Sequence, residues 1–252
     1  LPLFLLVNRW IKNGIALFEA WAQYDFDAEW SSRLGRQVIS YDNQRICGEI
    51  DWAQQGQSHD AAVITFHPKN QQLDLGFALN ANAENVLEPK TAYTTNYKNL
   101  QYAWYHTQFN KLNLSLLLLN TGYEFEKSIG NLETDYKQTF GTYLSFKEKK
   151  WDTNFGAYGQ TGKSADKKVN AWYAGAFVGY SVTNTFKVGL GYEYLSGKNQ
   201  NDSSSDIKSF NPIFGTNHGF NGFMDYFYVG NHQNNVGLQD AYLKLNYTSN
   251  KW

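Results

Sequence analysis

Apolar and polar residues alternate in many stretches of the sequence, and the connections between these stretches are short and long in turn. Three short connections end with a tryptophan that directly follows a charged residue, at Glu29-Trp30, Lys150-Trp151 and Lys251-Trp252. Apolar residues occupy the same place after three other short connections, at Leu73, Leu112 and Phe186. Tight turns at one edge of an antiparallel sheet, long loops at the other and aromatic residues at the boundary are typical of a transmembrane β-barrel. The pattern therefore predicts an all-β, up-and-down antiparallel transmembrane barrel.

We expect about eleven strands, each close to the roughly ten residues that a tilted strand needs to cross a bilayer. Their expected ranges are 14–24, 30–40, 59–67, 71–81, 97–109, 112–121, 134–147, 151–160, 169–180, 185–195 and 237–247. Short turns are expected at 25–29, 67–71, 110–111, 147–150 and 181–184. Long connections are expected at 41–58, 82–96, 122–133, 161–168 and 196–236.

Strict alternation assigns the side chains of each expected strand to two faces. Lys187 and Glu193 share a face with glycines, whereas the residues between them are apolar or aromatic. A charged side chain that faces hydrocarbon at mid-depth costs about 2–4 kcal/mol, so we expect Lys187 and Glu193 to line the lumen. Strand 112–121 departs from this rule, because Leu117 and Leu119 lie on its expected inner face. Either an inserted loop packs on these leucines, or the strand lies at a contact with another protein.

The composition fits a barrel wall. Aromatic residues make up 17% of the chain, yet its mean hydropathy is negative, as expected where alternate residues face lipid and lumen. The formal net charge of −1 gives no sign of a nucleic-acid partner. The five histidines show no metal-ligand spacing, and the single cysteine, Cys47, is expected to be a thiol in a loop rather than a nucleophile. We therefore expect no metal site and no cofactor.

Both ends of the chain are expected to lie inside a longer barrel. Residues 1–7 are apolar, but no basic region precedes them and no small-residue cleavage site follows, so they make a poor signal peptide. The other end stops at Trp252, the residue that should open a further strand. We expect residues 1–252 to form one β-barrel domain that is truncated at both ends and whose sheet cannot close.

Several segments resemble the alginate-export family of outer-membrane barrels. The first are Trp30-Ser-Ser-Arg-Leu-Gly-Arg-Gln37, Tyr41-Asp-Asn-Gln-Arg45, Asp51-Trp52 and His59-Asp60. Two later ones, Phe214-Gly-Thr-Asn-His-Gly-Phe-Asn-Gly-Phe-Met-Asp-Tyr-Phe-Tyr228 and Gly237-Leu-Gln-Asp240, are similar to the Bacteroidetes-type branch. The resemblance covers nearly the whole chain and implies a porin in the bacterial outer membrane, surrounded by its lipid, through which polar and anionic saccharides diffuse. We expect this porin to be a monomer.

The arginines are concentrated near the start of the chain. All four of them, Arg9, Arg33, Arg36 and Arg45, lie in the first 45 residues, and the other 18 of the 22 basic residues are lysines. A guanidinium binds a carboxylate through two parallel hydrogen bonds, so this usage predicts a place where anionic groups bind.

We expect Arg33, Arg36 and Arg45 in the lumen or at its mouth, near Asp51 and Asp60, and we count these five residues with Lys187 and Glu193 as candidate pore-lining residues. Alternatively, Arg33 and Arg36 pair with Asp51 or Asp60 and brace the barrel interior. Arg33 and Arg36 differ in parity, so a bulge at Gly35 would be needed to turn both inward.

The longest expected connection, 196–236, has a serine-rich acidic part at 202–206 and many aromatic residues after Ser209. We expect the first part to be mobile and the second to fold against the barrel mouth or into the lumen. No nucleophile elbow, phosphate loop or paired-carboxylate pattern occurs, so we expect no enzymatic activity. The alternatives are an outer-membrane enzyme and a soluble ligand-binding barrel. A Ser or Tyr hydroxyl within hydrogen-bond reach of a histidine in the lumen would favour the enzyme.

Overall fold

In the computed structural model the chain forms one antiparallel sheet of eleven strands. The structure describes residues 17–50, 56–80, 97–212, 214–227 and 236–249. The strands are β1 (Ala20–Asp25), β2 (Trp30–Gln37), β3 (His59–Phe66), β4 (Gln71–Leu79), β5 (Asn99–Phe109), β6 (Leu112–Ser128), β7 (Asn131–Glu148), β8 (Trp151–Ser164), β9 (Lys167–Ser181), β10 (Phe186–Leu195) and β11 (Leu238–Tyr247). A short 3₁₀ turn, η1 (Asn217–Gly219), lies between β10 and β11. In these ranges, no helix is long and apolar enough to cross a membrane.

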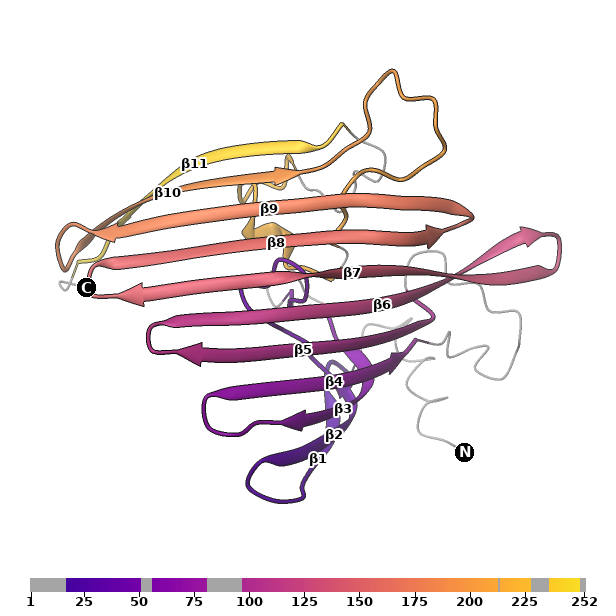
Figure 1. Ribbon diagram of the computed structural model, residues 1–252, viewed down its shortest axis with the longest axis horizontal. Helices are drawn as coiled ribbons and strands as arrows, with labels where there is room; N and C mark the ends of the chain where they lie inside the picture. The colour runs from indigo at the N-terminus through magenta and orange to yellow at the C-terminus, as the bar shows by residue number, and fades with distance from the viewer. Residues whose placement is uncertain (1–16, 51–55, 81–96, 213, 228–235, 250–252) are drawn as a thin grey trace.

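Each strand is hydrogen-bonded to its neighbours in sequence, so the sheet is a meander that runs from β1 to β11 (Figure 1). Every neighbouring pair is antiparallel. This confirms the predicted up-and-down architecture. Among the described strands β1 and β11 each have one bonded neighbour, and the sheet is open between them.

Two of the expected long connections are wrong. Residues 122–133 and 161–168 are largely strand, because β6 and β7 continue to a turn at Ile129-Gly130, and β8 and β9 continue to a turn at Ala165-Asp166. The expectation limited each strand to the thickness of a bilayer. A hairpin can extend past the membrane because its backbone N–H and C=O groups still pair across the two strands. In Figure 1 the β6–β7 hairpin accordingly projects beyond its neighbours.

The two faces of the sheet differ as the alternation predicts. On β6, Leu116 and Leu118 are 48% and 52% exposed, whereas Leu117 and Leu119 are 5% and 2% exposed. Other strands present large apolar side chains on the same outer face: Leu34, Ile64, Leu75, Phe140, Leu190 and Leu243. An apolar outer face and a covered inner face are the arrangement of a transmembrane barrel wall.

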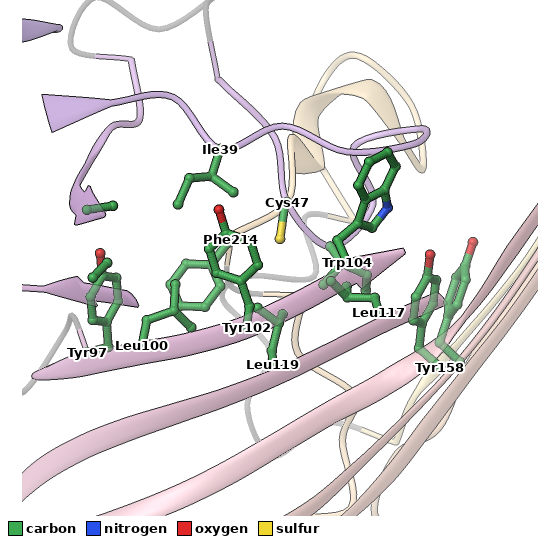
Figure 2. Packing of buried hydrophobic residues seen from close by; sticks show 14 of the residues in the cluster. Ile39, Cys47, Tyr97, Leu100, Tyr102, Trp104, Leu117, Leu119, Tyr158 and Phe214 are labelled. Carbon is green, nitrogen blue, oxygen red and sulfur yellow. The ribbon is translucent and has the colours of Figure 1, made fainter. Parts of the chain in front are cut away.

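Two long connections fold onto the inner face of the sheet. Ile39 and Cys47 from the connection after β2, and Phe210 and Phe214 from the connection after β10, belong to the buried core. Figure 2 shows Ile39, Cys47 and Phe214 over side chains that rise from the sheet, Leu119 among them. An inserted loop therefore packs on the inward leucines of β6, which is the first of the two alternatives drawn from the sequence.

The aromatic half of the connection after β10 meets the expectation only in part. Phe210 and Phe214 are 2% and 7% exposed, as expected for residues that fold into the lumen. Phe223 and Tyr226 are instead 76% and 80% exposed, so the expectation is wrong for this part of the loop. These side chains lie beyond η1, where the described chain has left the buried core.

Candidate functional site

The two inserted connections are hydrogen-bonded to each other. The Gly48 amide donates to the Phe214 carbonyl (2.8 Å), and the Thr216 amide donates to the Gln44 carbonyl (2.9 Å). The side chain of Gln57 donates to the carbonyls of both Gly48 (2.8 Å) and Phe214 (2.7 Å). We call this unit the inner plug and define it as residues 38–50 and 207–221, with residue 213 outside the described part. Its two segments are held as one body on the inner face.

Arg45 fixes the inner plug to the wall at β9 and β10. Its side chain is 0% exposed, and Nη2 donates to Glu193 Oε2 (3.0 Å) and to Asn221 Oδ1 (3.2 Å). The guanidinium carbon lies 4.3 Å from the ring centre of Phe220 and 5.2 Å from that of Tyr173. The Tyr173 hydroxyl donates to the other oxygen of Glu193 (2.8 Å). Loss of one partner of a buried ion pair costs about 3–5 kcal/mol, so this contact holds the plug strongly.

Tyr41 and Asp42 fix the inner plug to the opposite part of the wall, at β4 to β6. The Tyr41 ring stacks on Trp104, with centroids 4.4 Å apart and planes 16° apart, and its hydroxyl donates to Asp74 (2.8 Å). Asp42 accepts a hydrogen bond from Trp104 Nε1 (3.2 Å). Burial raises the pKa of the Asp42 carboxyl, and hydrogen bonds from Ser115 and Trp104 act in the opposite direction. The plug therefore spans the inner face between two anchored ends.

The inner face does hold hydroxyls beside histidines, the arrangement that would favour an enzyme. His106 Nδ1 lies 3.1 Å from Ser115 Oγ, and His59 Nδ1 lies 2.7 Å from the hydroxyl of Tyr97. The donor and acceptor roles in the contact between His106 and Ser115 depend on the histidine tautomer. Ser115 is only 2% exposed, so its hydroxyl is covered where a nucleophile would have to be open to a substrate.

A polar recess lies on the short-turn side of the inner plug. It is a cavity of about 330 Å³ bounded by β1 to β5 and by the start of the plug. Its lining residues are Gln23, Ser31, Arg33, Gln37, Val38, Ile39, Ser40, Tyr41, Val63, Thr65, His67, Gln72, Asp74 and Tyr102. Arg33 and Asp74 bring one charge of each sign into it. Hydroxyls, amides and charges in one cavity of this size suit a hydroxyl-rich solute.

Arg33 and Arg36 face opposite sides of the sheet. Arg33 lines the polar recess and donates through Nε (3.2 Å) and Nη2 (2.9 Å) to Gln23. Arg36 lies on the outer face with Leu34, which is 66% exposed, and binds both oxygens of Asp60 at 2.8 Å. The register is continuous through Gly35 on both sides, so the bulge that would have turned both arginines inward does not occur. Arg36 and Asp60 thus pair as the bracing alternative proposed, on the outer face rather than in the interior.

The remaining candidate residues fall in separate places. Arg45 and Glu193 are brought together as the buried pair of the inner plug, whereas Arg33 lines the polar recess and Arg36 pairs with Asp60. Lys187 lies on the inner face near the short-turn end of β10 and is exposed. Asp51 lies outside the described residues. The expected single cluster of three arginines with two aspartates is therefore not formed by the described part of the chain.

Sequence reasoning missed Tyr41, Asp74, Trp104 and Asn221, which hold the plug or line the recess. Alternation along β4 and β5 turns Asp74 and Trp104 inward, but it does not mark them as contacts of the inner plug. Tyr41 and Asn221 lie in loops, where no local pattern encodes a partner. Within the described ranges, no group of three or more His, Cys, Asp or Glu side chains could hold a metal ion.

A curved antiparallel sheet with an apolar outer face and a polar, plugged inner face defines a β-barrel wall of the outer-membrane type. The chain belongs to the alginate export family, whose sequence profile it matches over residues 11–246.

Among solved structures, the chain is similar to one described as a porin, with 9% identity, a TM-score of 0.46, and 69% of this chain and 54% of that chain covered. It therefore spans about half the length of that porin. It is also similar to the NanC porin, with 8% identity, a TM-score of 0.40 and 91% of both chains covered. No curated protein matches the sequence at a significant level.

Proposed function

We propose that the protein is part of an outer-membrane channel through which polar saccharides, including anionic ones, diffuse without chemical change. The observation that carries the proposal is the polar recess, which lies inside a wall whose outer face is apolar. Membership of the alginate export family supports a channel as the general role. No cofactor enters this proposal.

The recess has the properties that weak, passing contacts require. Its volume of about 330 Å³ lies at the lower end of the range for small-molecule sites, about 300–1,000 Å³, so it has room for one sugar unit at a time. Arg33 offers donors to a carboxylate, while Gln23 and Gln72 offer donors and acceptors to hydroxyls. Asp74, in the same cavity, weakens the attraction for an anion, and a bound solute must leave for conduction to continue.

We further propose that the protein acts as a monomer in the lipid of the bacterial outer membrane. The exposed apolar side chains on the outer face of β2, β3, β4, β6, β7, β10 and β11 support contact with acyl chains. A monomer is consistent with apolar side chains spread over many strands rather than gathered on one.

The channel can be tested with the full-length protein in liposomes and planar bilayers. We expect liposomes that contain it to swell in neutral and acidic disaccharides, and single channels to conduct ions. Replacement of residues 41–47 by a Gly-Ser linker should raise the single-channel conductance, because those residues bridge the lumen. Absence of both swelling and conductance for protein with the far-UV spectrum of a folded barrel would overturn the proposal.

The enzyme alternative can be separated in the same preparation. A fluorophosphonate probe labels activated serines, and we expect no labelling of the folded protein, since Ser115 is buried. Ser115→Ala supplies the matched control. Labelling that this substitution abolished would favour the enzyme over the channel.

A further inference from the structure

Two aromatic rings form one surface on the inner face of β9, β10 and β11. Phe177 is opposite Gly191 in the β9–β10 register, and Gly191 is opposite Tyr242 in the β10–β11 register, so the three residues form one row. The two ring planes are within 15° of each other, with centroids 6.3 Å apart. The Phe177 and Tyr242 rings are therefore nearly parallel neighbours. We call this pair the aromatic platform.

Glycines let the rings lie flat on the wall. A Cβ atom on Gly189 would be 2.3 Å from Cζ of Phe177, and one on Gly191 would be 2.1 Å from Cζ of Tyr242. Each ring therefore occupies the space that a side chain on β10 would have filled. A ring that leans over a glycine of the neighbouring strand in this way can present its face to the lumen.

The aromatic platform is open, unlike most aromatic residues of the inner face. Tyr102, Tyr158 and Tyr173 are 5%, 5% and 3% exposed, because they lie in the buried core. Phe177 and Tyr242 are half-buried, with no segment of the inner plug among their ring contacts. A solute in the lumen can reach these two rings.

Positive charge borders the aromatic platform on its short-turn side. Lys244 is exposed, and its Nζ lies 5.6 Å from the ring centre of Phe177 and 5.1 Å from that of Tyr242. Lys187 lies on the same face of β10, four residues before Gly191 of the platform row. Within the described part of the chain, neither lysine lies within ion-pair distance of a carboxylate.

The nearest carboxylates lie on the other side and are already held. Glu193 and Asp240 face each other in the row next to the platform. Asn221 of the inner plug donates to both of them at 3.1 Å, and Arg45 donates to Glu193. The platform thus has bound negative charge toward the plug and unpaired positive charge toward the short turns.

We propose that the aromatic platform binds one pyranose ring of an acidic saccharide by stacking, and that Lys244 binds the acidic group of the same sugar. The proposal rests on the proposed channel and adds a second contact point, apart from the polar recess. The apolar C–H face of a pyranose covers flat aromatic surface and loses contact with water. Its carboxylate draws the Lys244 ammonium away from the rings into an ion pair, and the exposed lysine side chain can make that movement.

The test measures binding directly, on detergent-solubilised full-length protein. The probes are trigalacturonate and its trimethyl ester, which has the same rings without the charges. In saturation-transfer NMR on the unmodified protein, irradiation of aromatic protons should saturate the ring C–H protons of both probes most strongly. This measurement needs no variant to fold. Its absence for both probes would overturn the proposal.

Substitutions separate the stacking contact from the ionic one. The double variant Phe177→Leu/Tyr242→Leu keeps apolar volume but removes the flat faces, and we expect about tenfold weaker binding of both probes. Lys244→Gln should weaken trigalacturonate by about fivefold and leave the ester unchanged. Tyr194→Leu is the matched control, because Tyr194 stacks on Trp172 (4.4 Å, 16°) on the outer face of the same strands. Unchanged affinity in the double variant would contradict the platform.

Conductance of the same preparation keeps the two proposals apart. Binding that depends on the platform, in a protein that does not conduct, would refute the channel and leave the platform standing. Conductance without platform-dependent binding would refute the platform and leave the channel standing.

Discussion

At the scale of single residues, the inner plug depends on a few side chains whose partners lie far away in sequence. Arg45 and Glu193 are the clearest case, because both are almost fully buried and each is the other's charge partner. A buried ion pair adds little over apolar residues of the same size, but removal of one partner leaves the other charge uncompensated. The inner plug is therefore destabilised when either residue of the pair is lost. We call the pair the plug lock.

Single and double substitutions of Arg45 and Glu193 test the plug lock. Arg45→Met should lower the free energy of unfolding by about 3–5 kcal/mol, reduced by any water that reaches Glu193 once the plug loosens. Glu193→Gln should also destabilise, and the double variant Arg45→Met/Glu193→Gln should be more stable than the sum of the two single losses predicts. The measurement is urea unfolding followed by tryptophan fluorescence in detergent. Strict additivity of the two losses would show that the side chains do not interact.

Cys47 reports whether the inner plug is closed. The thiol is buried, and burial, with a contribution from Asp42, raises its pKa to about 12. Only the thiolate reacts with iodoacetamide, and a pKa near 12 leaves about one thiol in ten thousand ionised at pH 8. The alkylation rate of the folded protein should therefore be far below that of the urea-unfolded protein at pH 8, and should rise as the pH approaches 12. Ser128→Cys in the β6–β7 hairpin gives an exposed control, and equal rates at the two positions would contradict a closed plug.

At the scale of elements, the strands and their faces follow from alternation, but their lengths do not. Alternation on β10 places Lys187 and Glu193 on one face, because apolar residues separate them on that strand. The ends of β6 to β9 were misplaced because hairpins continue into water for as long as both strands can pair. The backbone hydrogen bond between Thr216 and Gln44, which are far apart in the sequence, is not indicated by any local sequence pattern. The sequence therefore predicts the strands of the wall, but it does not predict which loop residues pair with each other inside the lumen.

Gly35 is a position where an added methyl group should separate one pair of strands. Its φ is +126°, and a Cβ atom would lie 2.3 Å from the Ala20 carbonyl oxygen and 2.8 Å from Trp21 Cα, both in the backbone of β1. Gly35→Ala should therefore push β1 away from β2 and cost at least about 1–3 kcal/mol of backbone strain. Hydrogen exchange of residues 20–25 should accelerate while that of β6 and β7 stays unchanged.

Gly130 provides the control for this substitution. It also has a positive φ, +77°, but nothing lies within 4 Å of the added Cβ atom. Gly130→Ala should disturb the β6–β7 turn alone. Exchange in 20–25 that is equal in the two variants would show that the close approach of β1 at Gly35 has no consequence.

At the scale of the whole molecule, charge is arranged in regions of the inner face although the formal net charge is only −1. The polar recess carries Arg33 and Asp74, the inner plug neutralises Glu193 with Arg45, and Lys187 and Lys244 remain unpaired among the described residues. A passing anion would meet the lysines and Arg33 as open positive charges. Arg36, by contrast, forms an ion pair with Asp60 at the outer face.

Arg33 and Arg36 therefore provide a matched pair for ion selectivity, two residues of the same type and strand on opposite faces. We expect Arg33→Ala to shift the reversal potential of the full-length channel toward cation preference in a salt gradient, because it removes a lumen charge. Arg36→Ala should leave the reversal potential unchanged and lower thermal stability instead, since Asp60 loses the partner that holds both of its oxygens at 2.8 Å. Bilayer recordings and heat-induced mobility shifts measure the two effects on the same protein. A selectivity change in Arg36→Ala equal to that in Arg33→Ala would contradict the assignment of these arginines to different faces.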